Sequence, residues 1–133
     1  MRLLVCGGRD YGEIPKGCPP DQIRSYSMEA DRTILILRAT LNDLHRDRHF
    51  TVLVNGKARG AERHASEWAE CCGLKIEPFL PNWRKLGKAA GPIRNQQMID
   101  IGKPDLVVAF PGGHGTADMV RRAKRANIET IEL

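Results

Sequence analysis

Glycine-rich turns are the segments of this 133-residue sequence in which chemistry is easiest to locate. The turn at residues 111–116 reads PGGHGT and lies between an apolar run and an amphipathic stretch. Glycines there leave backbone N–H groups exposed at a helix start, where those groups and the helix dipole attract a phosphate. The residues expected to cradle this anion are Pro111, Gly112, Gly113, His114, Gly115 and Thr116. A structural turn with a capped helix uses the same residue types, so both interpretations stay open.

Two other turns combine glycine with a basic residue directly after an apolar run. The first follows residues 3–6 and reads GGRD, and the second follows residues 51–55 and reads GKARG. If the apolar runs are strands, both turns lie on the same sheet edge as the PGGHGT turn, and their arginines can neutralise a phosphate. The residues expected to bind the ligand from these turns are Gly7, Gly8, Arg9, Asp10, Gly56, Arg59 and Gly60.

An aromatic residue, a cation and an amide gather upstream of the PGGHGT turn. Gly91 and Pro92 mark a helix entrance, which would place Arg94 in the first turn of that helix. A cation there opposes the helix dipole, so a bound anion is the expected reason for it, with an ordinary surface arginine as the alternative. Asn95 is suited to hydrogen-bond a ribose or a base. Trp83 either stacks on a base or packs in a loop or in the core.

Two carboxylates near these turns are candidates for general acid or base catalysis. Glu62 follows the second glycine turn, and Asp118 lies shortly after the PGGHGT turn. A catalytic carboxylate would exchange a proton with the substrate, provided that burial raises its pKa. Both residues also fall near the start of an expected helix, where the helix dipole stabilises a carboxylate without any ligand. The catalytic and the structural interpretation are both kept.

Apolar periodicity predicts an alternation of strands and helices. Short apolar runs bounded by glycine or proline are typical of buried strands, and apolar steps of three and four mark the helices. Strands are expected at residues 3–6, 51–55, 74–79, 105–110 and 128–133, and helices at 29–48, 61–72, 93–101 and in the segment after residue 115. The irregular stretch between residues 9 and 28 is either a lid or a surface insertion without a role.

This alternation requires crossover connections and hence a parallel sheet. The expected fold is an α/β, Rossmann-like three-layer sandwich, in which a mostly parallel sheet of about five strands carries helices on both faces. One domain is expected over residues 1–133, since a chain of this length allows one core and not two. Ligands of such open sheets bind outside the carboxyl ends of the strands, which is where the glycine turns lie.

The positive net charge favours one class of partner but does not identify the partner. The net charge of +5 at pH 7 favours an anionic partner, although a solvated basic surface has the same composition. Basic residues at 121–125 make nucleic acid an alternative but less favoured partner. A nucleotide-derived small molecule is the expected partner, in a homodimer or higher homo-oligomer, because dimers are the commonest assembly.

Cysteine spacing and hydropathy indicate a cytoplasmic protein. The four cysteines lack the C-x-x-C spacing of metal sites, so Cys6, Cys71 and Cys72 are expected to be reduced and buried as small apolar residues. Neither a metal nor another cofactor is expected. No apolar run is long enough to cross a membrane and no secretory signal is evident, so no membrane partner is expected.

Four segments together resemble one protein family. They are GGRDY at residues 7–11, GKARGAERHASEWA at 56–69, NW followed by GKAAGPIRN within 82–95, and PDLVVAFPGGHGT at 104–116. In this combination the chain resembles the SLOG superfamily, and most of all its YspA-like branch, which is related to YpsA and common in phage and bacterial genomes. The resemblance spans almost the whole chain. It implies a Rossmann-like domain that binds nucleotides or nucleotide-derived ligands, in some members as a sensor in antiviral signalling.

The PGG-x-GT element is similar to that of LOG-type phosphoribohydrolases, and the superfamily also includes the DNA-processing protein DprA. The LOG-type pattern continues to a catalytic glutamate, and this sequence has Met119 at that position. The resemblance implies that Arg94 matches the substrate-holding arginine, whereas a thioether cannot carry the proton of the reaction unless Asp118 substitutes. The first hypothesis is therefore a nucleotide-binding sensor, sequestering or processing protein. The alternatives are a nucleoside 5'-monophosphate N-glycosidase and a DprA-like nucleic-acid-binding protein.

Overall fold

Five strands form one parallel sheet in a computed structural model that describes residues 1–133. The strands are β1 (Arg2–Cys6), β2 (Val52–Asn55), β3 (Lys75–Pro78), β4 (Leu106–Ala109) and β5 (Glu129–Glu132). Their order is β3-β2-β1-β4-β5, and all neighbouring pairs are parallel. The chain reverses its direction across the sheet between β1 and β4, so the connections after these two strands lead to helices on opposite faces of the sheet. A crevice opens at such a point, and ligands of doubly wound sheets bind there.

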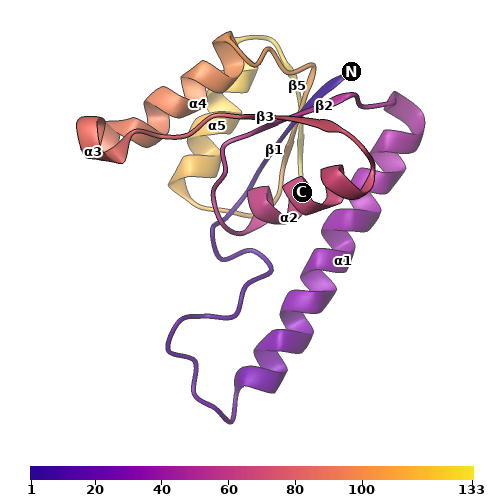
Figure 1. Ribbon diagram of the computed structural model, residues 1–133, viewed down its shortest axis with the longest axis vertical. Coiled ribbons are helices and arrows are strands. Elements are labelled where there is room, and N and C mark those ends of the chain that lie inside the picture. The colour runs from indigo at the N-terminus through magenta and orange to yellow at the C-terminus, as the bar shows by residue number, and fades with distance from the viewer.

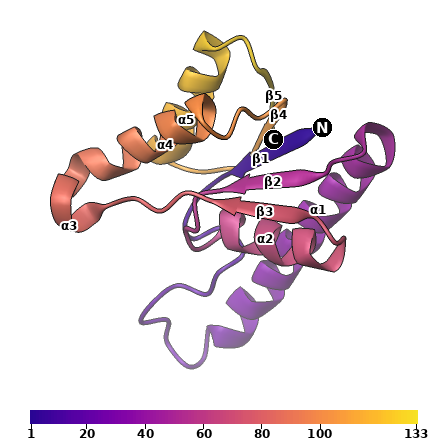
Figure 2. The same ribbon diagram turned by 45° about the horizontal axis from the view of Figure 1, so that its top comes forward.

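Helices cover both faces of the sheet, which confirms the expected three-layer α/β architecture (Figure 1). On one face lie α1 (Ile23–Arg48) and α2 (Ala61–Cys71), and on the other lie α4 (Ala90–Asp100) and α5 (His114–Arg125). A short helix α3 (Trp83–Leu86) and a 3₁₀ turn (Gly87–Ala89) precede α4 and project from one side of the sheet (Figure 2). No helix combines the length and the apolar character needed to cross a membrane.

The strands divide the core into two halves because successive side chains point to opposite faces of a sheet. Leu3 and Val5 of β1 pack with Leu37 and Leu41 of α1, among other residues of that cluster. Leu4 and Cys6, which alternate with them along β1, belong to the other cluster, under α4 and α5. All of these side chains are buried. Both faces of β1 are thus apolar, which explains why its sequence shows a continuous apolar run rather than alternation.

Several element boundaries differ from the sequence prediction. Helix α1 begins at Ile23 rather than at residue 29, and α4 begins at Ala90 rather than at residue 93. Strand β3 is shorter than residues 74–79. The first two turns of α1 lie beyond the sheet, so they carry no apolar stripe that periodicity can detect. The expected burial of Cys71 and Cys72 is also wrong, because both lie at the exposed end of α2, whereas Cys6 is buried as expected.

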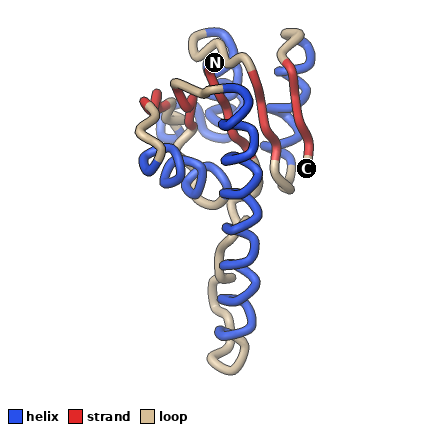
Figure 3. Tube along the Cα trace, turned by 90° about the vertical axis from the view of Figure 1, so that its right-hand side faces the viewer, coloured by secondary structure: helices blue, strands red, loops and turns tan.

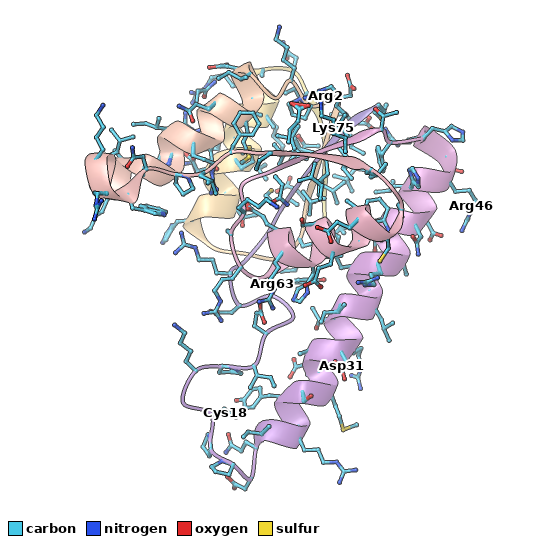
Figure 4. All side chains as sticks on the ribbon, in the orientation of Figure 1. Arg2, Cys18, Asp31, Arg46, Arg63 and Lys75 are labelled. Carbon is cyan, nitrogen blue, oxygen red and sulfur yellow. The ribbon has the colours of Figure 1, made fainter.

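The start of α1 and the preceding loop form an arm, defined here as residues 10–34, that extends beyond the sheet (Figure 3). The loop runs back along the helix, and the Tyr11 hydroxyl donates to the Thr33 carbonyl oxygen at 3.5 Å. Arg63 of α2 lies on the side of the helix that faces the loop (Figure 4), and its salt bridge of 2.6 Å to Glu13 ties the loop to α2. Of residues 9–28, only Arg9 lines the cavity described below, which does not favour the lid interpretation.

Candidate ligand-binding site

A hollow of about 590 Å³, here called the edge cavity, lies at the carboxyl ends of β1 and β4. The turns after these strands, the first turns of α2 and α5 and part of α4 surround it. The predicted site residues that line it are Gly7, Gly8, Arg9, Glu62, Trp83, Gly91, Arg94, Asn95, Gly113, His114, Gly115, Thr116 and Asp118. The fold therefore brings together residues from four separate stretches of the sequence.

Two predicted glycines lie behind the cavity and allow its wall to close. The Gly8 N–H group donates to the Pro111 carbonyl oxygen at 2.9 Å, which joins the turns after β1 and β4. A Cβ on Gly112 would collide with the Thr116 hydroxyl and the Gly8 amide, and one on Gly60 would collide with the Gly8 carbonyl. Gly60 also has a φ of +82°, which favours glycine. Glycine is required at both positions for close packing of the backbone.

The remaining predicted residues lie outside the cavity lining. Arg59 and Asp10 form an exposed pair with each other, 3.4 Å apart, and neither lines the cavity. Gly56 also lies outside it, although its carbonyl oxygen binds Arg94. Gly56 therefore supports the cavity from outside through Arg94, and the structure does not place Asp10 or Arg59 in the cavity lining.

The first turn of α5 presents unpaired backbone donors to the cavity. Gly113 is the N-cap residue, and no side chain caps the helix. The N–H groups of His114, Gly115 and Thr116 have no partner within the protein, and the first bond of the helix runs from Ala117 to the Gly113 carbonyl. All three residues line the cavity, so a ligand there can approach these amides. Unpaired amides at a helix start bind anions.

Arg94 is a buried cation beside the cavity, only 7% exposed. Its Nη1 group donates to the Gly56 carbonyl oxygen at 2.6 Å and its Nε group donates to the Asn95 side-chain oxygen at 3.2 Å. Because α4 begins at Ala90, Arg94 lies in the second turn rather than the first, which corrects the prediction from the dipole argument. The Gly56 carbonyl already stabilises the guanidinium group, while Nη2 has no partner in the chain.

Glu62 is buried at the start of α2 and lines the cavity. Its Oε2 atom accepts a hydrogen bond from the Ala58 N–H group at 3.0 Å, which holds the preceding turn against the helix. A Cβ on Gly56 would touch both Glu62 and Arg94, so the carboxylate and the guanidinium group flank the same glycine. Glu62 thus has a structural role in the turn, and its side chain also lines the cavity in which a ligand would bind.

Asp118 belongs to a polar network that joins α4 and α5. Its carboxylate accepts hydrogen bonds from Asn95 at 3.0 Å, from Arg122 at 2.8 Å and from Arg121 at 3.3 Å. Burial acts to raise the pKa of Asp118, but the bonds from Arg122 and Asn95 outweigh it and hold the pKa below its ordinary value. Asp118 is therefore ionised at neutral pH, which does not suit a general acid.

Trp83 lies at the mouth of the cavity, where its side chain is 45% exposed, so it is not a core residue. The guanidinium carbon of Arg9 lies 5.5 Å from the centroid of the ring. A Cβ on Gly91 would come within 3.3 Å of the ring edge, so the start of α4 also packs against the indole. A cation over an aromatic ring is attracted to it, which links α3 to the turn after β1.

Five residues line the cavity that the sequence interpretation did not include as ligand contacts. They are Cys6, Ala58, Pro92, Met119 and Arg121. Burial, followed by the charge of Glu62, raises the pKa of the Cys6 thiol to about 12, which removes it as a nucleophile. Arg121 has a sequence signal, because it lies seven residues after His114 and three after Asp118, on the same face of α5.

Comparison with known proteins gives the family. The sequence model of the YspA, cpYpsA-related SLOG family matches residues 1–86. A protein of Mycobacterium phage D29, described as Gene 61 protein, is 38% identical over 110 residues, which cover 77% of this chain and 86% of that protein. The PGGHGT turn lies beyond the matched residues, so its likeness to LOG-type enzymes remains a resemblance. The match includes β1 through α3, and the chain belongs to the YspA, cpYpsA-related SLOG family.

Proposed function

We propose that this protein binds a nucleotide or a nucleotide-derived phosphate ligand in the edge cavity, as a sensor, sequestering or processing protein. The single observation that carries the proposal is the set of unpaired N–H groups of His114, Gly115 and Thr116 beside the free Nη2 group of Arg94. Both are donors to an anion, and they reach the same cavity from different elements. Membership of a SLOG family supports the same class of ligand.

The size and the lining of the cavity suit a ligand larger than inorganic phosphate. Pockets for small ligands typically have volumes of about 300–1,000 Å³, and the edge cavity has about 590 Å³. A phosphate at the start of α5 leaves room for a nucleoside toward Trp83, whose exposed ring can stack on a base. Asn95 already donates to Asp118 and to the Gly115 carbonyl, so its proposed role is to hold the site rather than to bind the base.

Calorimetric titration tests this proposal. AMP, ADP-ribose and cyclic nucleotides are the probes, and adenosine, which lacks phosphate, is the matched control ligand. Binding by at least one phosphate-bearing probe, together with a rise in melting temperature, is the expected result, because a ligand that binds only the folded state stabilises it. Absence of heat and of a melting shift with every probe would refute the proposal, and so would adenosine binding as tightly as AMP.

Hydrolysis of the N-glycosidic bond is a second candidate function, and Glu62 is the observation that favours it. Asp118 is paired with arginines, whereas Glu62 is buried in the lining and takes part in no salt bridge. In this reaction water adds to the sugar carbon as the bond to the base breaks, and the base leaves with a proton. A buried carboxylate can accept the proton of that water.

Chromatographic detection of free base after incubation with nucleoside monophosphates tests this second candidate. Glu62→Gln retains an oxygen that can accept from Ala58, so the turn should keep its fold. Release of base by the wild type and by Asp118→Asn, with loss in Glu62→Gln, is the expected pattern. Equal product from the wild type and a Glu62→Gln, Asp118→Asn double variant would eliminate the hydrolase.

A further inference from the structure

One oxygen of the Glu62 carboxylate has no partner in the chain. Glu62 is only 6% exposed, and its Oε2 atom accepts from the Ala58 N–H group, whereas its Oε1 atom accepts no hydrogen bond and forms no salt bridge. The two ring nitrogens of His64 are the only side-chain nitrogen or oxygen atoms that are closed to solvent and unpaired, so Oε1 of Glu62 is reached from the cavity that the residue lines. A buried acceptor of this kind needs a donor from outside the chain.

The other carboxylate of the lining has no free oxygen to offer. Asp118 accepts from Arg121 through Oδ1, and from Arg122 and Asn95 through Oδ2. Glu62 and Asp118 are the two acidic residues of the lining. Glu62 therefore supplies the free carboxylate oxygen of the edge cavity.

The charge of a carboxylate determines which part of a ligand can approach it. A carboxylate accepts hydrogen bonds and donates none, and it repels a phosphate. The donors that suit a phosphate lie elsewhere in the lining, at Nη2 of Arg94 and at the first turn of α5. The group that meets Glu62 must therefore be an uncharged donor of the ligand, such as a hydroxyl or an amino group.

Glu62 lies deep in the cavity, on the wall that also holds Arg94. A Cβ on Gly56 would touch Oε2 of Glu62 and the guanidinium group of Arg94. Cys6 at the end of β1 is 4% exposed, and the charge of Glu62 is near enough to contribute to its raised pKa. Trp83, at 45% exposed, lies at the mouth instead. A nucleotide with its phosphate at Arg94 and its base on Trp83 has its sugar between them, so a sugar hydroxyl is the donor nearest to Glu62.

We propose that Oε1 of Glu62 accepts a hydrogen bond from a ribose hydroxyl group of the bound nucleotide, which makes Glu62 a specificity-determining residue for ribonucleotides. This inference rests on the proposed function, since it concerns the ligand of the same cavity. The hydroxyl donates and the carboxylate accepts, and the single free oxygen accommodates one such bond. A ligand without sugar hydroxyls removes the bond and leaves a buried carboxylate oxygen without a donor, which costs affinity.

Calorimetric titration of the full chain with AMP and with 2',3'-dideoxy-AMP tests this role. The dideoxy analogue keeps the phosphate and the base and lacks both sugar hydroxyls. The wild type is expected to bind AMP about ten- to a hundredfold more tightly, because a hydrogen bond to a charged acceptor is lost with the analogue. Titration with 2'-deoxy-AMP and 3'-deoxy-AMP then identifies which hydroxyl donates.

Glu62→Gln should lower the ratio of the two affinities about fivefold or more, because a hydrogen bond to a neutral amide is weaker than one to a carboxylate. Its affinity for the dideoxy analogue should not fall, since the substitution removes a negative charge from the neighbourhood of the phosphate. Glu70→Gln is the matched control. Glu70 is an exposed carboxylate of the same helix, forms no salt bridge and lies outside the lining, so this variant should keep the ratio of the wild type.

The outcomes separate this role of Glu62 from the proposed function. Equal affinities of the wild type for AMP and the dideoxy analogue would overturn the role and leave nucleotide binding intact. A Glu62→Gln variant that weakens both ligands equally would overturn it too, because Glu62 would then hold the structure or bind the base. Absence of binding by every phosphate-bearing probe would refute the proposed function, and the role of Glu62 with it.

Discussion

Replacement of Arg94 by alanine removes the one buried guanidinium group of the edge cavity. Its free Nη2 group is positioned to donate to a bound phosphate, and a hydrogen bond to a charged group contributes about 1.5–3 kcal/mol. Loss of that contact corresponds to a dissociation constant about ten- to a hundredfold higher. Arg94→Lys keeps the charge but offers no planar fork, so we expect its affinity to lie between those of the wild type and Arg94→Ala.

Arg94→Ala also affects stability, and the structure gives the size of that effect. The buried Gly56 region loses the 2.6 Å hydrogen bond from Nη1 to its carbonyl oxygen. An unsatisfied buried acceptor costs about 1–3 kcal/mol. For a chain of this length, each kcal/mol lowers the melting temperature by about 3–6 °C. The binding titrations should therefore be carried out at a temperature well below the melting temperature of the variant, so that weak binding is not confused with unfolding.

Arg48→Ala is the matched control for this experiment. Arg48 forms a bidentate pair with Glu129, at the opposite edge of the sheet from the cavity. Its removal deletes the same positive charge together with a salt bridge that lies away from the cavity, so the dissociation constant for the same nucleotide should not change. An affinity of Arg94→Ala equal to that of the wild type would refute the assignment of Arg94 to the phosphate. Equal losses in both variants would show that net charge, and not the site, controls binding.

Three further predictions concern packing, pH and nucleic acid. Gly112→Ala should destabilise the fold by about 1–3 kcal/mol, because the added Cβ collides with Thr116 and Gly8. Gly115→Ala has open space around the added Cβ and should stabilise α5 by up to about 1 kcal/mol. Urea unfolding measures both free energies. The ionised Asp118 carboxylate should stabilise the fold above its ordinary pKa near 3.8, and this stabilisation should be lost as the pH falls through the lowered pKa of the folded state. The unfolding free energies of the wild type and Asp118→Asn should therefore converge in acid. Parallel pH profiles of the two proteins would contradict this reasoning. DNA should bind weakly or not at all, since three of the four cations near the end of α5 are in salt bridges, and a strong gel shift that fades steeply with salt would show otherwise.

Local patterns in the sequence were sufficient for the order of the five strands and the four longer helices, but they did not predict the short helix α3 or the 3₁₀ turn after it. The apolar run of β4 and the glycine turn after it predicted a buried strand followed by a helix start, because both signals depend on neighbouring residues only. The start of α1 was not predictable in this way. Its first turns have no sheet to pack against, and the contact of the returning loop through Tyr11 reaches the helix only at Thr33, about three turns further on.

The sequence by itself determined that strands and helices alternate, and it placed glycine, arginine and threonine at the ends of the strands. Only the tertiary structure decided which of these groups face the cavity. Arg94 lies in it because the Gly56 carbonyl holds its guanidinium group, and Arg59 does not line it and pairs with Asp10 instead. Asp118 is ionised because Arg122 and Asn95 surround it. The physical reason is that periodicity reports contacts along the chain, whereas the direction and charge of a side chain depend on partners from distant segments.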